Sequence, residues 1–558
     1  MKTYATQSDC FSSWEQEALS FHRATARVKA AQESVLRKIL MENSATEYGK
    51  RFGFAETTSS YEYRERVPMV DYAAIESYVE RIAGGEHDIL FRGRPLCLQP
   101  TAGTTSGSKM IPFTVALRKE FQRGVAAWHC DMWSQMPGMR QGKAYWSVSP
   151  VLGEGRMTTG GIPVGFLDDT EYLTPAMASA LKKTFAVPNS VGLVREGELF
   201  RYLTMAFLLK ARDLTFVSVW NPTFFMLLLD SLRDNYGNIV EDIARGELSR
   251  INELPKALRA TIAGSFGGAD RKRAEELRSL LAHGSGHGNA IYARLWPDLQ
   301  LISCWEDAEA KGPAARLREL FPAVKVQPKG LMATEAVVSI PLHDAEYPVL
   351  SLRSHFFEFI LTGAESEVVN AWEVEQDRLY EVVVTTGGGL YRYRLGDVVK
   401  VRGFYNGCPM LEFMGRGTHT SDYYGEKLHQ RHVTEMIGEV FSDRSRASWF
   451  ALLAPDGDEE VDHYTLFVAF DGPIDGTWLT GLGSRLENRL RSNFHYDYCR
   501  KLGQLKELEV CPVGLDVTNS LKKYMEEQKS RGIREGEIKP ALLDNRPVWK
   551  RVFKVIQE

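Results

Sequence analysis

The sequence predicts an α/β fold, with a large N-terminal domain of mixed β-sheets and flanking helices and a smaller C-terminal αβ domain. Short apolar runs alternate with helical patterns along much of the chain, which is typical of sheets covered by helices. A strand-rich texture begins at Leu379, and a compact αβ pattern begins near Asp422. The chain has 558 residues, enough for roughly two to four domains.

The N-terminal part combines helical patterns with short apolar runs. Residues 12–41 and Ala116–Trp133 carry apolar side chains at helical spacing, whereas residues 43–54 break into turns, and a charged helix is expected at Ala269–Ala282. The most apolar segment, Leu214–Leu232, is interrupted by Asn221-Pro222, so we expect a strand, a turn and a core helix rather than a membrane span. The runs expected to form buried strands are Met110–Phe113, Tyr145–Val148, Thr215–Trp220, Leu299–Cys304 and Val324–Gln327.

A second set of strands precedes the expected domain boundary. These strands are Leu379–Thr385, Gly389–Arg394, Asp397–Arg402 and Leu411–Met414. Gly415 opens a polar, glycine-containing stretch that suits a hinge, so we predict domains at residues 1–415 and 422–558 with a hinge at 416–421. The expected C-terminal elements are helices Glu426–Phe441, Trp478–Asn493 and Asn519–Lys529 and strands Trp449–Leu453, Tyr464–Phe470 and Leu508–Val510.

Charge and cysteine content exclude several classes. A net charge of −4 argues against a nucleic-acid binder held by bulk electrostatics. The seven cysteines form no C-x-x-C pair, so neither a zinc site nor a disulfide framework is suggested, and a reducing, cytoplasmic setting fits best. Residues 1–10 are polar and lack the apolar core of a signal peptide. We expect no membrane association, and no obligate protein partner is evident.

The stretch from Thr101 to Lys109, T-A-G-T-T-S-G-S-K, is the most informative segment. Glycine lets backbone N–H groups converge on an anion, and the hydroxyl groups and the lysine add donors and charge. This chemistry suits the phosphates of ATP, although such runs are also common in surface turns. The spacing is not that of a Walker A loop, which needs G-x-x-x-x-G-K followed by Ser or Thr. The candidate phosphate-binding residues are Thr101, Gly103, Thr104, Thr105, Ser106, Gly107 and Lys109.

Three charged residues downstream are further candidates, each with an ordinary alternative. Glu335 lies in an otherwise apolar stretch, so it needs either a cation such as Mg²⁺ or a partner arginine in the core. Asp397 follows a glycine and either accepts hydrogen bonds from ribose hydroxyls or is an ordinary hairpin-turn residue. Lys539, in a proline-ended loop, is either delivered to a phosphate or is a solvated surface lysine.

The order of these segments resembles the adenylate-forming enzymes, and most closely a bacterial-type member of the Gretchen Hagen (auxin-responsive) family of acyl acid amido synthetases. The resemblance spans essentially the whole chain, and G-L-Y-R-Y-R-L-G-D is its most specific element. The matching motifs are T-A-G-T-T-S-G-S-K-M-I-P at 101–112, L-W-P-D-L at 295–299, G-L-M-A-T-E at 330–335, H-F-F-E-F at 355–359, G-L-Y-R-Y-R-L-G-D at 389–397 and S-D-Y-Y-G-E-K-L at 421–428.

The resemblance implies an ATP-dependent ligase that uses Mg²⁺. A carboxylic acid would attack the α-phosphate of ATP to give an acyl-adenylate and pyrophosphate, and an amino acid amine would then form an amide and release AMP. In this family pattern Thr101–Lys109 would bind the ATP phosphates and Glu335 would contact Mg²⁺, while Thr334 would contact the phosphate or the acyl-adenylate. Asp397 would bind ribose, Arg416 would lie near the nucleotide at the domain junction, and Lys539 would approach the α-phosphate, with the C-terminal domain mobile between steps.

The sequence departs from the family pattern at three places and leaves the acyl site open. Related enzymes often have an aromatic residue at the position of Leu331 and glycine at that of Ser106, and the usual Tyr-Lys-x-Pro-Arg around the C-terminal lysine is Ile-Lys-Pro-Ala here. The alternatives are an acyl-CoA ligase that forms a thioester and a nucleotide-binding regulatory protein without turnover. The acyl-pocket candidates, which also suit an ordinary core, are Trp128, Val164, Phe166, Trp220, Phe224 and Phe225.

Overall fold

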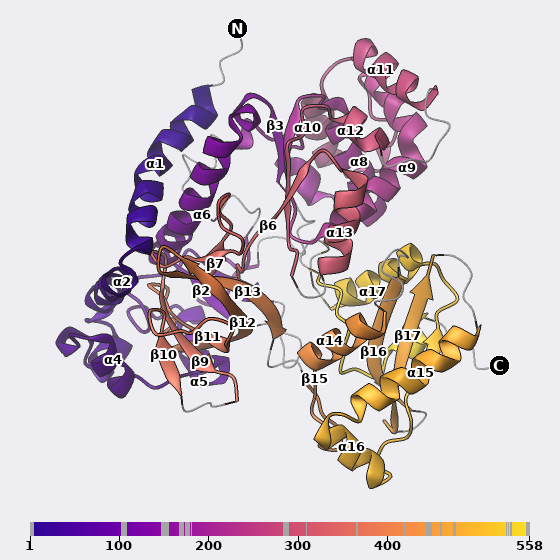
Figure 1. Ribbon diagram of the computed structural model, residues 1–558. Helices are drawn as coiled ribbons and strands as arrows, with labels where there is room; N and C mark the ends of the chain where they lie inside the picture. The colour runs from indigo at the N-terminus through magenta and orange to yellow at the C-terminus, as the bar shows by residue number, and fades with distance from the viewer. Residues whose placement is uncertain are drawn as a thin grey trace. The chain divides into compact units, whose positions relative to one another are not determined.

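The computed structural model divides the chain into two compact units (Figure 1). The first comprises Met1–Glu306, Lys311–Leu395 and Val399–Phe413, and the second comprises Asp307–Ala310, Gly396–Val398 and Met414–Glu558. Among the described residues, no helix has the length and apolar character needed to cross a membrane. The residues described are 5–101, 109–146, 156–166, 172, 179, 181–282, 290–307, 310–363, 367–416, 420–441, 449–457, 460–471, 476–531, 533, 535 and 538–553.

The N-terminal helical region differs from the predicted single helix at residues 12–41. Two helices, α1 (Ala5–Thr25) and α2 (Val28–Asn43), are separated at Arg27, whose φ of −140° ends the helical geometry. The predicted turn region also contains a short helix, α3 (Glu47–Arg51), whose start is capped by the Thr46 side chain accepting from the Gly49 amide. Further elements here are η1 (Phe54–Glu56), α4 (Ser60–Arg66), α5 (Tyr72–Ala83), α6 (Val115–Gln135) and η2 (Pro137–Gln141).

A four-stranded parallel sheet forms one layer of the first unit. Its order is β3-β4-β5-β6, and each adjacent pair is parallel. One face of the sheet packs into a large apolar core with helices that come between its strands in the chain, and the other face packs against α1 and α6 (Figure 1). The strands are β3 (Lys143–Trp146), β4 (Leu214–Ser218), β5 (Leu301–Cys304) and β6 (Lys325–Pro328). The helical elements of this core are η4 (Asn189–Leu193), α8 (Gly197–Lys210), α9 (Pro222–Arg245), η5 (Ile251–Glu253), α10 (Lys256–Phe266), α11 (Arg271–Ala282), α12 (Ala290–Leu295) and α13 (Lys311–Leu320).

A seven-stranded sheet carries the downstream motifs. Its order is β10-β9-β11-β12-β13-β8-β7. The predicted strand Gly389–Arg394 is wrong over its first four residues, where Gly389 and Arg392 take positive φ angles of 95° and 47° outside the β region. Regular pairing resumes at Tyr393 and runs through the predicted strand Asp397–Arg402. The strands are β7 (Ser339–Ile340), β8 (Val349–Leu350), β9 (Phe356–Leu361), β10 (Val368–Asn370), β11 (Leu379–Thr385), β12 (Tyr393–Tyr405) and β13 (Cys408–Arg416).

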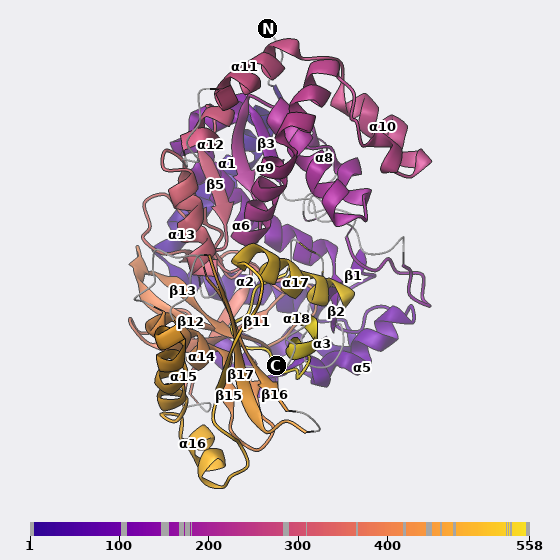
Figure 2. The same ribbon diagram turned by 90° about the vertical axis from the view of Figure 1, so that its right-hand side faces the viewer.

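The second unit is built on a three-stranded sheet, with α15 (Gly476–Leu490) and α18 (Trp549–Phe553) on opposite sides of it (Figure 2). The alternation of side chains explains this. Tyr464 and Leu466 face the core formed with α14 and α15, whereas Phe467 contacts Phe553 of α18. The sheet consists of β16 (Trp449–Asp456), β17 (His463–Phe470) and β18 (Glu509–Pro512). The other helices are α14 (Gln430–Val440), α16 (Phe494–Lys501) and α17 (Val517–Ser530).

The predicted helix Glu426–Phe441 begins later than expected, at Gln430. A short strand, β15 (Leu428–His429), comes first and pairs with β14 (Thr420–Ser421). The Glu426 carboxylate is used instead to accept from the Tyr423 and Tyr424 amides. These local bonds compete with helix formation over the first residues of the predicted segment.

Candidate functional site

The glycine- and hydroxyl-rich segment begins and ends on two paired strands. These strands, β1 (Cys97–Thr101) and β2 (Lys109–Phe113), pair in antiparallel register, with Thr101 opposite Lys109. The Lys109 ammonium lies 5.8 Å from the ring centre of Tyr72, whose hydroxyl accepts from the Met110 amide at 2.9 Å. Gly103, Thr104, Thr105, Ser106 and Gly107 lie outside the described residues. The structure therefore fixes the two ends of the predicted phosphate loop.

Thr334 and Glu335 form the tip of a second, very tight turn. Met332 and Val337 are antiparallel partners, and the Ala333 amide donates to the Ala336 carbonyl at 2.9 Å. Only Thr334 and Glu335 lie between the paired residues Ala333 and Ala336, so the turn is as short as a two-residue hairpin loop. Glu335 is 6% exposed, and Thr334 is half-buried. The turn thus presents a hydroxyl and a nearly buried carboxylate side by side on a rigid support.

Asp397 and Arg416 are partners. Asp397 lies within β12 rather than at a turn, so its interpretation as a hairpin-turn residue is wrong. The Arg416 Nε donates to Asp397 Oδ1 at 2.9 Å across the β12–β13 ladder. Asp397 is almost fully buried, so a charge-assisted bond of this kind keeps its carboxylate compensated.

Lys539 is exposed on a segment whose backbone is anchored. The Tyr524 hydroxyl donates to the Lys539 carbonyl at 3.0 Å and accepts from the Ala541 amide at 3.2 Å. Tyr524 is buried and stacks on Trp549, with ring centres 5.1 Å apart. Therefore the backbone at this position is held to the core of the second unit while the side chain reaches solvent.

Two of the acyl-pocket candidates meet around a lysine that the sequence analysis missed. The Lys329 ammonium lies 5.3 Å from the ring centre of Trp128 and 5.0 Å from that of Trp220, and it donates to Ser218 Oγ at 2.6 Å. Lys329 is 3% exposed and directly follows β6. In open α/β sheets, ligands bind outside the carboxyl ends of the strands, which is where β4 ends at Ser218. The only feature of the sequence that could have pointed to Lys329 is its position directly after a predicted buried strand.

The remaining acyl-pocket candidates include Phe166, which shares an apolar core with Trp128, and Phe224 and Phe225, which lie in a different core. Phe166 packs edge-on against Phe113, and Val164 is half-buried beside β1 as the bridge partner of Leu98. Phe224 and Phe225 are fully buried in the core of the parallel sheet. The described candidates therefore do not form a single cluster, and the pair that meets a polar group is Trp128 with Trp220.

His129 is a second residue that the sequence analysis missed. It is buried within aromatic side chains and donates from Nδ1 to the Val125 carbonyl at 2.9 Å. Nε2 has no hydrogen-bond partner among the described residues. Burial, reinforced by the nearby Lys329 charge, lowers the pKa of His129 from 6.5 to about 4. The four indole rings within 6 Å of the imidazole centre belong to Trp14, Trp128, Trp133 and Trp146.

The lowered pKa of His129 predicts that the free energy of unfolding depends on pH. Between pH 6.5 and about 4, the unfolded chain binds a proton that folded His129 does not, so the free energy of unfolding falls as the pH falls through this window. Replacing His129 with phenylalanine removes this contribution. The stability difference between the wild type and His129→Phe should shift by about 2 kcal/mol from pH 7 to pH 5, measured by urea denaturation. Parallel pH profiles of the two proteins would contradict the buried neutral state.

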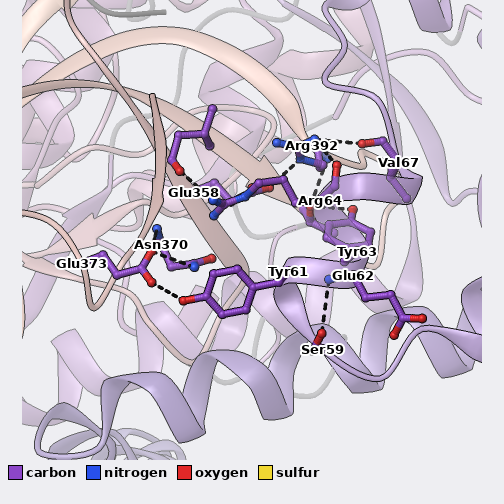
Figure 3. A network of polar contacts seen from close by, with 12 residues as sticks. Ser59, Tyr61, Glu62, Tyr63, Arg64, Val67, Glu358, Asn370, Glu373 and Arg392 are labelled. Carbon is purple, nitrogen blue, oxygen red and sulfur yellow. Dashed lines mark hydrogen bonds and ion pairs between the residues drawn. The ribbon is translucent and has the colours of Figure 1, made fainter. Parts of the chain in front are cut away.

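The first of the two arginines in the G-L-Y-R-Y-R segment, Arg392, belongs to a buried network (Figure 3). Arg392 Nε donates to Glu358 Oε2 at 2.9 Å, and Arg64 Nε donates to Glu358 Oε1 at 3.1 Å. Arg392 also donates to the Val67 carbonyl at 2.9 Å. The network joins H-F-F-E-F to G-L-Y-R-Y-R, so these two motifs support the fold through a shared buried ion pair.

Within the described ranges, no group of three or more His, Cys, Asp or Glu side chains could hold a metal ion. Glu335 alone is compatible with a Mg²⁺ ion that takes most of its ligands from substrate phosphates and water, which is the usual arrangement for this ion.

Comparison with known proteins shows which family of proteins this chain resembles. Models of the GH3 family N-terminal, central and C-terminal domains match residues 18–326, 348–416 and 428–547, respectively. The probable indole-3-acetic acid-amido synthetase GH3.11 of Oryza sativa subsp. japonica is 27% identical over 427 residues, covering 70% of this chain and 69% of the relative. The jasmonoyl–L-amino acid synthetase JAR4 of Nicotiana attenuata is 28% identical over 422 residues, covering 72% of this chain and 71% of the relative.

The fold is that of a solved structure. AtGH3.15 acyl acid amido synthetase in complex with 2,4-DB superposes with a TM-score of 0.82 at 21% identity, covering 99% of this chain and 97% of that chain. The predicted α/β fold, with a large N-terminal part of mixed sheets and helices and a smaller C-terminal part, is confirmed. The fold and the relatives define an ATP-using acyl acid amido synthetase, a ligase that activates a carboxylic acid as an acyl-adenylate and joins it to an amino acid. The chain belongs to the GH3 family.

Proposed function

We propose that one group of the residues described above binds the nucleotide and that another group binds the carboxylic acid. The Thr101–Lys109 segment binds the ATP phosphates, and the Thr334–Glu335 turn contacts the transferred phosphate and its Mg²⁺. Asp397 accepts hydrogen bonds from ribose, with Arg416 beside it. Lys539 neutralises charge at the α-phosphate. The observation that carries this assignment is the two-residue turn, which holds a nearly buried carboxylate next to a hydroxyl.

The first half-reaction needs positioning and charge compensation rather than a protein nucleophile. An acid carboxylate is a poor acyl donor, and its attack on the α-phosphate builds negative charge on the phosphate oxygens. Lys539 and the backbone amides of the Thr101–Lys109 segment stabilise that charge and hold the reacting groups in line. Mg²⁺, when bound at Glu335, supplies further charge neutralisation. The amide-forming step then requires an unprotonated amino acid amine at the activated carbonyl.

The acid is recognised near Trp128 and Trp220. Indole faces bind flat apolar bodies, and a few polar groups orient the ligand in such sites. Lys329 lies against both rings and carries an ammonium that attracts a carboxylate or another acceptor. These three side chains support an aromatic or similarly flat hydrophobic acid as substrate.

The predicted hinge at residues 416–421 remains part of the proposal. The acyl-adenylate hydrolyses if water reaches it, and the two half-reactions need different groups at the same carbonyl. A movement of residues 422–558 between the steps would withdraw Lys539 after adenylation and admit the amine.

The function is tested by offering the full-length protein pooled carboxylic acids, pooled amino acids and Mg·ATP, with products identified by mass spectrometry. We expect an amide of one acid class, together with AMP and pyrophosphate. Acid-dependent exchange of pyrophosphate into ATP reports the first step alone. A thioester formed only when coenzyme A replaces the amino acids would favour an acyl-CoA ligase instead. The absence of exchange with every acid would favour a regulatory nucleotide-binding protein.

The ribose role of Asp397 makes a separate prediction. Replacing Asp397 with alanine removes an acceptor of charge-assisted bonds, each worth about 1.5–3 kcal/mol, so ATP affinity should fall by roughly 10- to 100-fold. Isothermal titration measures this directly. The control is Glu412→Ala. The Glu412 carboxylate lies on β13, next to the strand of Asp397, and accepts a hydrogen bond from Arg402. Its removal should leave ATP affinity unchanged. Equal affinities for the wild type and Asp397→Ala would remove Asp397 from the nucleotide site.

A further inference from the structure

A buried acid–histidine pair lies directly behind the Thr334–Glu335 turn. Glu120 comes from α6, and His355 immediately precedes β9; both are almost fully buried. His355 Nδ1 lies 3.0 Å from Glu120 Oε2, and His355 Nε2 accepts from the Val337 amide at 3.1 Å. Val337 closes the turn as the partner of Met332. The pair therefore reaches the backbone of the turn that carries Glu335.

These contacts fix the tautomer of His355. A backbone N–H can only donate, so Nε2 must be the unprotonated nitrogen, and Nδ1 carries the proton and donates it to the Glu120 carboxylate. The imidazole is held from its own backbone as well, because the Gln32 amide donates to the His355 carbonyl at 2.8 Å. The ring thus has one orientation and one protonation pattern that satisfy both neighbours.

Glu120 also holds a second loop. Its carboxylate accepts from the Gly387 amide at 2.9 Å, in the T-G-G-G stretch that precedes G-L-Y-R-Y-R. A Cβ on Gly387 would lie 2.6 Å from Glu120 Oε1, so only glycine permits this approach. One helical turn along α6, Gly124 leaves room for Val337, whose Cγ1 a Cβ would meet at 2.8 Å. The helix, the glycine loop and the Thr334–Glu335 turn are locked together at this point.

We propose that Glu120 and His355 form a positioning relay that sets the Thr334–Glu335 turn for adenylation. Neither residue touches the reacting atoms in this scheme. Glu120 orients the imidazole, the imidazole holds the Val337 amide, and the two-residue turn passes that constraint to Glu335. The inference rests on the proposed role of Glu335 in binding Mg²⁺ with ATP. Groups that orient a metal ligand typically contribute about 10- to 100-fold in metal affinity or activity.

Two variants of His355 separate the halves of the relay. In His355→Asn, the amide can still donate to Glu120, but it is too short to accept from Val337. In His355→Gln, the amide oxygen reaches the position of Nε2 and can accept from Val337. We expect His355→Asn to raise the Mg²⁺ concentration needed for half-maximal pyrophosphate exchange by about 10- to 100-fold, whereas His355→Gln stays within a few-fold of the wild type. The melting temperature of each variant checks that the fold is kept.

The outcomes distinguish the relay from the function on which it rests. A His355→Asn variant with the wild-type Mg²⁺ requirement would overturn the relay. A His355→Gln variant with a strongly raised Mg²⁺ requirement would also overturn it. The His355→Gln result alone tests the relay if the His355→Asn variant does not fold. Nitrogen NMR of histidine-labelled protein, with the His355 signals assigned from the Gln variant, should show the Nδ1–H tautomer whether or not the protein has activity. The other tautomer, or a charged ring at neutral pH, would overturn the relay. Wild-type protein that shows this tautomer but no exchange with any acid would refute the proposed function alone.

Discussion

Replacing Lys539 with alanine should reduce acid-dependent pyrophosphate exchange by roughly 10²- to 10³-fold, the loss typical of removing one group that stabilises charge in a transition state. The reason is electrostatic. Charge develops on the α-phosphate oxygens as the acid attacks, and Lys539 would compensate it only at that moment. The substitution should leave the fold intact, because the side chain is exposed while the backbone carbonyl, which alanine retains, accepts from Tyr524.

The matched control is Lys523→Ala. Lys523 is a partly exposed lysine of the C-terminal region and makes a surface contact with Glu526 at 3.4 Å. Its removal should change neither exchange nor melting temperature. The amide-forming step offers a second comparison: chemically prepared acyl-adenylate should react with the amino acid at a similar rate in the wild type and in Lys539→Ala. Normal exchange by Lys539→Ala would remove this lysine from the proposed mechanism.

The regular elements of the fold could be predicted because their signals are local. The strand Leu379–Thr385 is found at its predicted boundaries, and α6 extends the predicted helix Ala116–Trp133 by one residue at its start and two at its end. The errors fall where tertiary contacts override the local pattern. The alternation of Tyr391 and Arg392 reads as a strand, yet Arg392 takes a positive φ while its side chain bonds to Glu358. No periodic pattern in the sequence predicts the bond between Arg392 and Glu358.

The candidate site was predicted unevenly for the same reason. Glu335 could be singled out because a carboxylate among apolar residues is conspicuous in a sequence. Lys329 could not, since its importance comes from Trp128 and Trp220, which lie far away along the chain. The Glu120–His355 pair joins residues 235 positions apart. Order along the sequence indicates the chemistry of such a site, but only the fold shows which buried groups hold it in place.

The buried network around Glu358 gives the largest expected effect on stability. Glu358 is 1% exposed and lies in β9, where two arginines, Arg64 and Arg392, compensate its charge. Arg392 is the more deeply placed of the two, with 6% of its side chain exposed against 23% for Arg64. Removing one member of a buried ion pair leaves the other charge without compensation, which costs far more than the pair contributes.

Arg392→Met should therefore lower the free energy of unfolding by about 3–5 kcal/mol, measured by urea denaturation followed through tryptophan fluorescence. Methionine keeps much of the apolar stem, so the loss reports the missing guanidinium and its bonds to Glu358 and the Val67 carbonyl. Arg394→Met is the matched control two residues along the chain. Arg394 pairs with Glu381 and its side chain is 37% exposed, so this variant should lose no more than about 1 kcal/mol. Similar losses in the two variants would mean that the G-L-Y-R-Y-R segment does not stabilise the protein through its buried arginine.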